Sequence, residues 1–113
     1  MSLAIRLLPD TLRSLGFASV GAAYMGVGTA LSRPARMIFV QNLTDSNVMF
    51  SLDGINDHFP LPVNGFLVLD ITANKTVDTG FFIAEGQRLY VKELLAAPTS
   101  GAVYFTVFYG ADL

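Results

Sequence analysis

The sequence contains no cysteine, no tryptophan and only one histidine, His58. Without cysteine the chain has no disulfide framework, no thiolate nucleophile and no thiolate metal site. A single histidine excludes a multi-histidine metal site within one chain. Charged residues are also few, at 14% against 52% hydrophobic residues. This balance excludes a disordered, highly solvated chain and favours a surface that a partner partly covers.

The chain of 113 residues is long enough for one domain with one core. Its net charge of −2 is unevenly divided. Four arginines and one aspartate give residues 1–36 a charge of +3, whereas three basic and eight acidic residues give residues 37–113 a charge of −5. A basic segment on an acidic body predicts that the segment contacts a surface unlike the body's surroundings. The arginines are not clustered, so we expect no direct nucleic-acid binding.

Residues 1–35 lack the alternating pattern of the later chain and are predicted to form an extended N-terminal arm, with a β-sandwich domain at residues 36–113. Asp10 is placed to cap a short helix at residues 11–15, which Gly16 would end. The arm has too few large apolar side chains to become ordered alone. It therefore needs a surface to lie against, either in its own domain or on a neighbour. Fully extended, such an arm reaches about 115 Å and could cross to other subunits.

The window at residues 14–32 carries no charge and raises the alternative of a membrane span. Small residues recur in it at every fourth position, as in packed transmembrane helices; they are Ala18, Ala22, Gly26 and Ala30. Its four glycines and few large apolar residues argue against a span, and Pro9 and Asp10 interrupt any secretory leader. We expect no membrane partner, and a membrane-anchored β protein remains the alternative.

Short apolar runs separated by Gly, Pro, Asn and Asp fill the chain after residue 36. Residues 37–42 and 48–52 flank a Thr-Asp-Ser-Asn turn and predict a hairpin that Asp53 and Gly54 close. Further strands are predicted at residues 58–62, 65–71, 80–84, 87–94 and 102–109. Six to seven strands at this spacing predict an all-β fold, a small antiparallel β-sandwich or jelly roll with an extended N-terminal arm. The last strand is aromatic on both faces, so we expect it to be central or covered by a partner.

The carboxylate and imidazole residues that could form a site are Asp53, Asp57, His58 and Asp70. No acidic residue closes a calcium loop after Asp53 and Asp57 at the required spacing, and aspartates are common in turns because they bond their own backbone. No serine lies in a nucleophile elbow, and one histidine beside aspartates does not define a catalytic site. We therefore predict that the chain is not an enzyme and has no catalytic residue, no metal-binding residue and no cofactor.

Two Asn-x-Thr triplets, at residues 42–44 and 74–76, match the N-glycosylation acceptor. Both fall at strand ends or in loops, where Asn and Thr are common. We interpret them as turn chemistry.

Several of these segments resemble small structural proteins of tailed double-stranded DNA phages. The likeness lies in residues 37–54, MIFVQNLTDSNVMFSLDG, where a strand ending in Asn-x-Thr leads to Ser-x-Asp-Gly. It continues through His58, a Leu-Asp-x-x-x-Asn segment ending at Asn74 and a final strand at residues 101–109. The resemblance covers roughly residues 36–109. An arm followed by a small jelly roll is also similar to the capsid cement, or staple, proteins of short-tailed phages.

The resemblance implies a virion structural protein that binds without catalysis. Such a protein is made in the host cytoplasm, lies on the outer capsid surface, bridges subunits of the major capsid protein and forms a homo-oligomer on the shell. We expect the arm to supply the contacts, through Leu7, Leu8, Leu12, Leu15 and Phe17 as apolar residues and Arg6, Arg13, Arg33 and Arg36 as partners of acidic groups.

Two further alternatives stay open beside the membrane-anchored protein. One is a head-to-tail or tail structural protein that forms a ring in few copies. The other is a non-catalytic ligand-binding or adhesion module whose exposed tyrosines stack on sugar; they would be Tyr90, Tyr104 and Tyr109.

Overall fold

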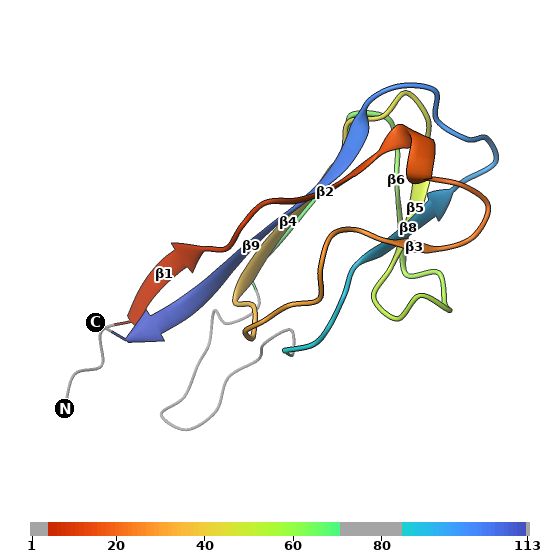
Figure 1. The fold of residues 1–113 in the computed structure, drawn as a ribbon. Coiled ribbons are helices and arrows are strands. Elements are labelled where there is room, and N and C mark those ends of the chain that lie inside the picture. Colours follow the sequence, from red (N-terminus) through yellow and green to blue (C-terminus); the bar gives the residue numbers. More distant parts are fainter. Residues whose placement is uncertain (1–4, 71–84, 113) are drawn as a thin grey trace.

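The computed structural model describes residues 5–70 and 85–112, and this part of the chain is built almost entirely of β-strands (Figure 1). A five-stranded sheet has the order β1-β9-β4-β7, with β2 also paired to β9, and a four-stranded sheet has the order β3-β8-β5-β6. All pairings are antiparallel. The elements are β1 (Ile5–Pro9), β2 (Arg13–Gly16), η1 (Phe17–Ser19), β3 (Met25–Gly26), β4 (Met37–Asn42), β5 (Val48–Ser51), β6 (Phe59–Leu61), β7 (Phe66–Asp70), β8 (Tyr90–Glu93) and β9 (Ala102–Asp112).

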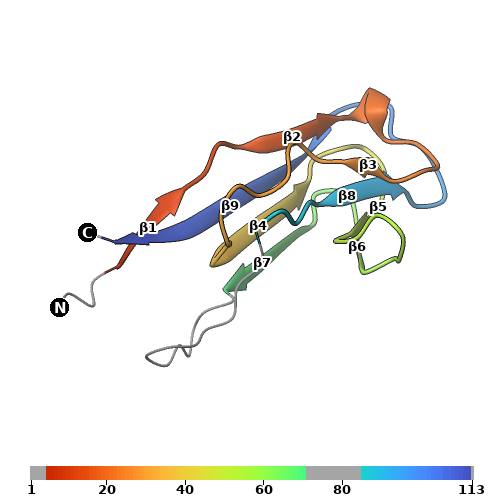
Figure 2. The ribbon, with the colours of Figure 1, turned by 60° about the horizontal axis from the view of Figure 1, so that its bottom comes forward.

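The connectivity is that of a jelly roll. If β1 and β2 are counted as one interrupted strand, the chain alternates between the two sheets, except that β5 and β6 follow each other within the four-stranded sheet. Two antiparallel sheets linked in this way form a sandwich with a core between them. Figure 2 shows the two groups of strands. The predicted fold class, an all-β antiparallel sandwich, is confirmed.

The core lies between the sheets because every second residue of a strand points inward, and these inward residues are mostly apolar. In β4, Ile38 and Val40 are buried while their neighbours are half-buried. The four-stranded sheet contributes Phe50, whose ring stacks on Phe59 with centroids 5.2 Å apart. The buried apolar residues are Val20, Val27, Leu31, Ala35, Ile38, Val40, Val48, Phe50, Leu61, Leu89, Val91, Val103, Phe105 and Val107.

The predicted hairpin at residues 37–52 is wrong. Its two strands lie in different sheets, since β4 pairs with β7 and β9 whereas β5 pairs with β6 and β8. The turn after β4 carries the chain across the sandwich instead of returning it along the same sheet. The hairpin within the four-stranded sheet is formed by β5 and β6, and residues 52–58 are its connecting loop. The predicted strand at residues 80–84 lies outside the described residues.

Residues 5–35 lie against the chain's own sheets. β1 and β2 pair with β9, and β3 pairs with β8. Four residues of this segment, among them Val27 and Leu31, belong to the buried core. The predicted helix at residues 11–15 is wrong, because residues 13–16 are a strand and Asp10 accepts a hydrogen bond from the adjacent Thr11 N–H. The sequence left open whether this segment lies on its own domain or on a neighbouring subunit. In the structure it lies on its own domain.

The C-terminal part of β9 extends beyond the sandwich. β4 reaches only as far as Phe108, while β1 continues to pair with β9 up to Asp112. Within the described residues, β1 and this part of β9 therefore form a two-stranded ribbon, which Figures 1 and 2 show leaving the body of the domain. Isolated two-stranded ribbons are marginally stable in water.

Candidate functional site

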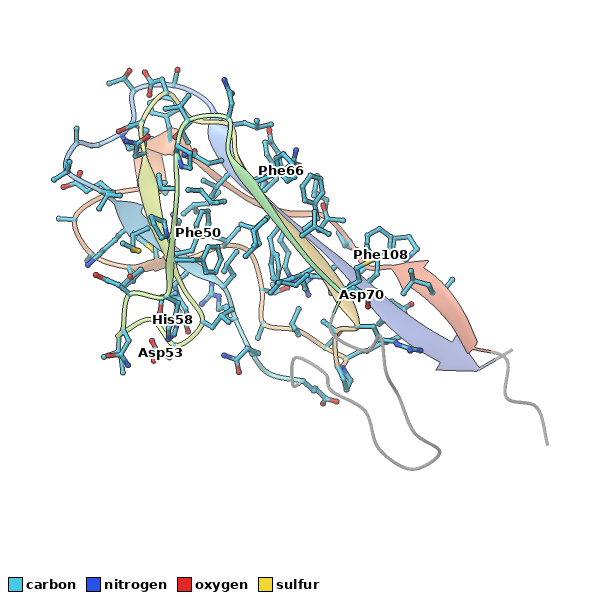
Figure 3. The ribbon with its side chains drawn as sticks, turned by 180° about the vertical axis from the view of Figure 1, so that it is seen from behind. Phe50, Asp53, His58, Phe66, Asp70 and Phe108 are labelled. Atoms are coloured by element: carbon cyan, nitrogen blue, oxygen red, sulfur yellow. The ribbon has the colours of Figure 1, made fainter. Side chains whose placement is uncertain are left out.

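The four residues that the sequence marked as a possible acidic and imidazole site do not come together. Asp53, Asp57 and His58 lie in the loop between β5 and β6, whereas Asp70 ends β7 in the other sheet. Figure 3 shows Asp53 and His58 near each other and Asp70 far from both. Within the part of the chain that the structure describes, no three residues of the metal-binding types form a cluster.

Asp53 organises its own loop. Its Oδ1 accepts hydrogen bonds of 2.8 Å from the backbone N–H groups of Ile55 and Asn56, and its Oδ2 accepts one of 2.8 Å from the Asn56 side chain. The Ser51 hydroxyl donates to it as well, at 2.8 Å. These donors, the backbone N–H groups first, hold the pKa of Asp53 far below its usual range. Asp53 is therefore a turn residue whose charge is already satisfied within the loop.

His58 is held by the same loop. Its Nδ1 accepts a 2.8 Å hydrogen bond from the Leu52 N–H, and its Nε2 lies 3.9 Å from Asp53 Oδ2. The nearby Ser51 hydroxyl donates to Asp53 and not to the imidazole. A serine nucleophile must hand its proton to a base, so this arrangement is not a nucleophile–base pair.

Asp57 joins three segments that are distant in sequence. Its Oδ1 accepts a hydrogen bond from the Tyr24 hydroxyl and lies 3.2 Å from Lys92 Nζ, which sits 4.8 Å from the centre of the Tyr24 ring. Burial, followed by the bond to Asp57, raises the pKa of Tyr24, and the same bond together with Lys92 lowers the pKa of Asp57. The contact fastens the segment before β3 to β8. No local sequence pattern pointed to Tyr24, because its partners Asp57 and Lys92 lie 33 or more positions away along the chain.

A cavity of about 420 Å³ lies where the chain breaks between β1 and β2, and its size is within the range of small-ligand sites. Hydroxyl groups and one ion pair line it; the lining residues are Asp10, Thr11, Leu12, Arg13, Ser14, Gly28, Thr29, Ala30 and Ser32. The charged group of interest is Arg13, which is only 7% exposed.

The guanidinium of Arg13 is used within the chain. Nη1 lies 3.2 Å from Asp10 Oδ2, Nε donates to the Thr29 carbonyl at 2.8 Å, and Nη2 donates to the Ala30 carbonyl at 3.3 Å. Gly28, with φ +68°, passes so close that a Cβ there would lie 2.7 Å from Arg13 Cβ. Arg13 thus fastens residues 28–30 to the strand break, and each of its nitrogens already has an acceptor before any ligand enters.

The other predicted partner-binding residues fall into separate places. Leu7 and Leu12 are about half exposed, at 52% and 55%, while Leu15 packs against the core. Leu8 is half-buried in β1, where Arg6 lies opposite Ala111. Phe17 is 38% exposed at the start of η1. Arg33 is exposed and places its guanidinium 4.3 Å from the centre of the Tyr109 ring, and Arg36 is half-buried beside β9.

The outer face of the five-stranded sheet is the largest feature that sequence analysis did not assemble. In the strand register, Phe39 of β4 lies between Val68 of β7 and Thr106 of β9. The residues two positions before and after Phe39 in β4 are paired in the same way, so that three rows of three residues share one face of the sheet. Figure 3 shows Phe66 and Phe108 on the side away from the four-stranded sheet, whereas Phe50 lies between the sheets. We call these nine residues the outer grid; they are Met37, Phe39, Gln41, Phe66, Val68, Asp70, Tyr104, Thr106 and Phe108.

The outer grid mixes apolar and polar side chains and is most exposed along β7. Phe66 is 64% exposed and Val68 46%, and the Phe39 and Phe66 rings meet edge to face with centroids 5.7 Å apart. Asp70 is its single charged residue. On its far side Leu7 and Pro9 of β1 continue the same face, since they pair with Gly110 and Phe108. Part of the signal was present in the sequence, since Tyr104 and Phe108 share one face of the last strand, but the strands that pair with it could not be predicted.

The tyrosines proposed as sugar platforms are differently placed. Arg88 lies over the Tyr90 ring at 5.8 Å and Arg33 lies over the Tyr109 ring at 4.3 Å. Tyr104 belongs to the outer grid. The three rings therefore do not form one stacking platform.

The first Asn-x-Thr triplet is structural. Asn42 is fully buried, and its Nδ2 donates to the backbone carbonyls of Ser46, Leu61 and Pro62 at 2.9, 3.1 and 3.1 Å. Its interpretation as turn chemistry agrees with this geometry, because a buried amide with three acceptors is not accessible for glycosylation. The second triplet, at residues 74–76, lies outside the described residues.

Comparison of the chain with protein-family models, with curated proteins and with solved structures finds no match. Among residues 5–70 and 85–112, no helix has the length and apolar character needed to cross a membrane.

Proposed function

We propose that this protein is a non-catalytic structural protein of a phage particle, most specifically a capsid cement protein that bridges and stabilises subunits of the major capsid protein from outside the shell. The observation that carries the proposal is the outer grid, a partly exposed sheet face that holds five apolar residues and one charge. Exposed apolar patches on soluble domains mark interaction surfaces. The resemblance of residues 36–109 to phage structural proteins supplies the class of partner.

The size of the outer grid matches binding that is modest per copy. Three strands about 4.8 Å apart, each presenting three residues about 6.8 Å apart, cover roughly 300 Å² in projection. A standard stable interface buries about 800 Å² per partner. The grid alone therefore supports a weak contact, and a cement protein can rely on many weak contacts because copies on a closed shell act collectively.

The side of β7 that faces away from β4 supports the same proposal. In the described chain, β7 pairs with β4 along one side only. An edge strand presents unpaired N–H and C=O groups that can add a strand from a partner. The edge lies directly beside Phe66 and Val68, so backbone pairing and apolar contact could act together on one neighbouring subunit.

Co-sedimentation with phage shells tests the proposal. Full-length wild-type protein, Val68→Lys and Ile55→Lys are mixed with shells of the encoding phage from which the minor proteins have been removed. Val68→Lys places a charge on the outer grid, while Ile55→Lys places one on an apolar residue of the β5–β6 loop that is more exposed, at 81% against 46% for Val68. We expect wild type and Ile55→Lys to saturate the shell in hundreds of copies and Val68→Lys to bind at least tenfold more weakly.

Two results would contradict the proposal. Saturation at a few copies would indicate a head-to-tail or tail ring, and absence of wild-type binding would exclude a role on the shell. Saturable binding to glycans without shell binding would favour the adhesion module.

A further inference from the structure

The end of the sandwich formed by residues 17–19, 43–47, 62–65 and 94–101 is a second surface, which we call the apex. Hydrogen bonds tie its four segments together: the Phe17 N–H donates to the Gly101 carbonyl at 3.0 Å, and Leu94 N–H donates to the Asn47 carbonyl at 3.2 Å. The Val63 N–H donates to the Asn47 side chain at 3.1 Å. These bonds join the four segments into one continuous surface.

The apex holds Leu95 in a conformation that a leucine rarely adopts. Its φ is +76°, in the left-handed region that favours glycine, and its side chain is 97% exposed. A left-handed backbone is unfavourable for a residue with a Cβ, and no burial compensates for it here. A glycine or asparagine would fit this turn better. A scattered exposed leucine needs no explanation, but a strained and fully exposed one does.

The residues on both sides of Leu95 are fixed to the same neighbouring loop. Leu94 donates to the Asn47 carbonyl, and the Ser46 hydroxyl donates to the Ala96 carbonyl at 2.8 Å. The turn is therefore a rigid base from which one apolar side chain projects. A side chain on a fixed backbone needs less ordering when it enters a partner's pocket, so less conformational entropy is lost on binding.

The charge of the apex selects the kind of partner. Its loops carry Asp45, with Glu93 at the end of β8 beside them, and no lysine, arginine or histidine. Other apolar side chains accompany Leu95 at the same end; they are Leu43, Val63 and Phe17, at 44%, 41% and 38% exposure. An anionic lipid surface or a nucleic acid would repel this end, whereas an apolar pocket with a basic rim on a protein would complement it.

We propose that the apex is a docking surface for a protein partner and that Leu95 is its anchor, inserted into an apolar pocket with a basic rim. Because the probe is the phage shell, this inference rests on the proposed function and adds a second contact to that of the outer grid. A bridging protein needs more than one contact, and the apex adds one at the end of the sandwich, where Gly65 leads directly into Phe66 of the outer grid.

The test uses the full chain with Leu95→Asn, Leu95→Gly and the matched control Ile55→Asn. Ile55 is also an exposed apolar loop residue, but it lies at the other end of β5. We expect both Leu95 variants to keep or raise Tm, the shift being a few degrees, because they relieve the left-handed strain. We expect them to bind shells at least tenfold more weakly than wild type, and Ile55→Asn to bind as wild type does.

The outcomes separate the two proposals. If wild type does not bind shells, the proposed function fails. If wild type binds and the Leu95 variants bind equally well, the role of Leu95 is overturned and the proposed function stands. A fall in Tm in both Leu95 variants would show that leucine is needed for folding and would also overturn it. Sedimentation of wild type, but not Leu95→Asn, with phosphatidylcholine or mixed phosphatidylserine vesicles would identify a lipid surface as the occupant.

Discussion

The Oδ1 of Asn42 accepts a 2.6 Å hydrogen bond from the hydroxyl of Thr44, and the two side chains are 0% and 3% exposed. Oδ1 also accepts the Thr44 N–H at 3.1 Å, while Nδ2 serves three backbone carbonyls. These bonds join the end of β4 to the β4–β5 turn and to the end of β6. The amide of Asn42 is therefore the point from which the chain crosses from one sheet to the other.

Asn42→Asp is expected to destabilise the protein by about 3 to 5 kcal/mol, because it replaces a donor by a buried carboxylate that faces the carbonyls of Ser46, Leu61 and Pro62. Urea unfolding followed by far-ultraviolet circular dichroism measures the loss. The matched control is Asn47→Asp, since Asn47 is exposed and uses its oxygen as an acceptor, which aspartate keeps. The control should change stability by about 0.5 kcal/mol or less. Equal stability of the two variants would contradict the bridging role of Asn42.

Much of the fold after residue 36 could be predicted from sequence because inward and outward residues alternate there. The strand from Met37 to Asn42 was predicted with its bounds, and the last strand was predicted to begin at residue 102. The pairing of these strands could not be predicted. The bonds that Asn42 makes with Leu61 and Pro62 span 19 and 20 positions, and they replace the hairpin that the local turn residues favoured.

Arg13 is the second test of how the chain is held together. Arg13→Met keeps the apolar stem beside Gly28 but removes the donor of the Thr29 and Ala30 carbonyls and the cation beside Asp10 Oδ2. We expect a loss of about 3 kcal/mol, since the two part-buried carbonyls are left unsatisfied. Thermal and urea unfolding measure it.

The control for Arg13 is Arg33→Met. Arg33 is exposed and contacts the Tyr109 ring, a contact of about 0.5 to 1 kcal/mol at an exposed site. If both arginine variants lose the same small amount of stability, Arg13 does not fasten the loop at residues 28–30.

Acid stability is expected to depend on Asp53. Its folded pKa lies below the ordinary value of 3.8 because backbone and side-chain donors stabilise the carboxylate. A depressed folded pKa means that the stabilisation is fully present above the unfolded pKa and is lost as the pH falls through the folded pKa. The urea midpoint of wild type should therefore fall from about pH 5 downward. Asp53→Asn should make the urea midpoint less dependent on pH, and an unchanged dependence would contradict the role of Asp53. The pH dependence that remains in this variant is expected from Asp45 and Asp57, which are also hydrogen-bonded and have lowered pKa values.

The candidate sites show what local sequence cannot supply. Asp53 was recognisable as a turn residue because its partners lie within three positions. Tyr24, Asp57 and Lys92 meet only after β3 has paired with β8, and the burial of Arg13 depends on β2 pairing with β9. The segment at residues 14–32 consists largely of small uncharged residues, so it carries no alternation that would reveal these strands. Its place is set by the edges that β8 and β9 offer.

Residues 10–35 are expected to be required for folding, whereas β1 is not. A chain starting at residue 36 loses Arg13 and four core residues, of which Val20, Val27 and Leu31 contribute about 2 kcal/mol each. About 6 kcal/mol is comparable to the whole stability of a small domain, typically 5–15 kcal/mol. This chain should be unfolded or insoluble.

A chain starting at Asp10 keeps every core residue and loses only the strand along the ribbon, so it should fold with a lower Tm. Circular dichroism and thermal unfolding of the two chains measure this. A folded, cooperative domain starting at residue 36 would show instead that residues 10–35 are a separable arm.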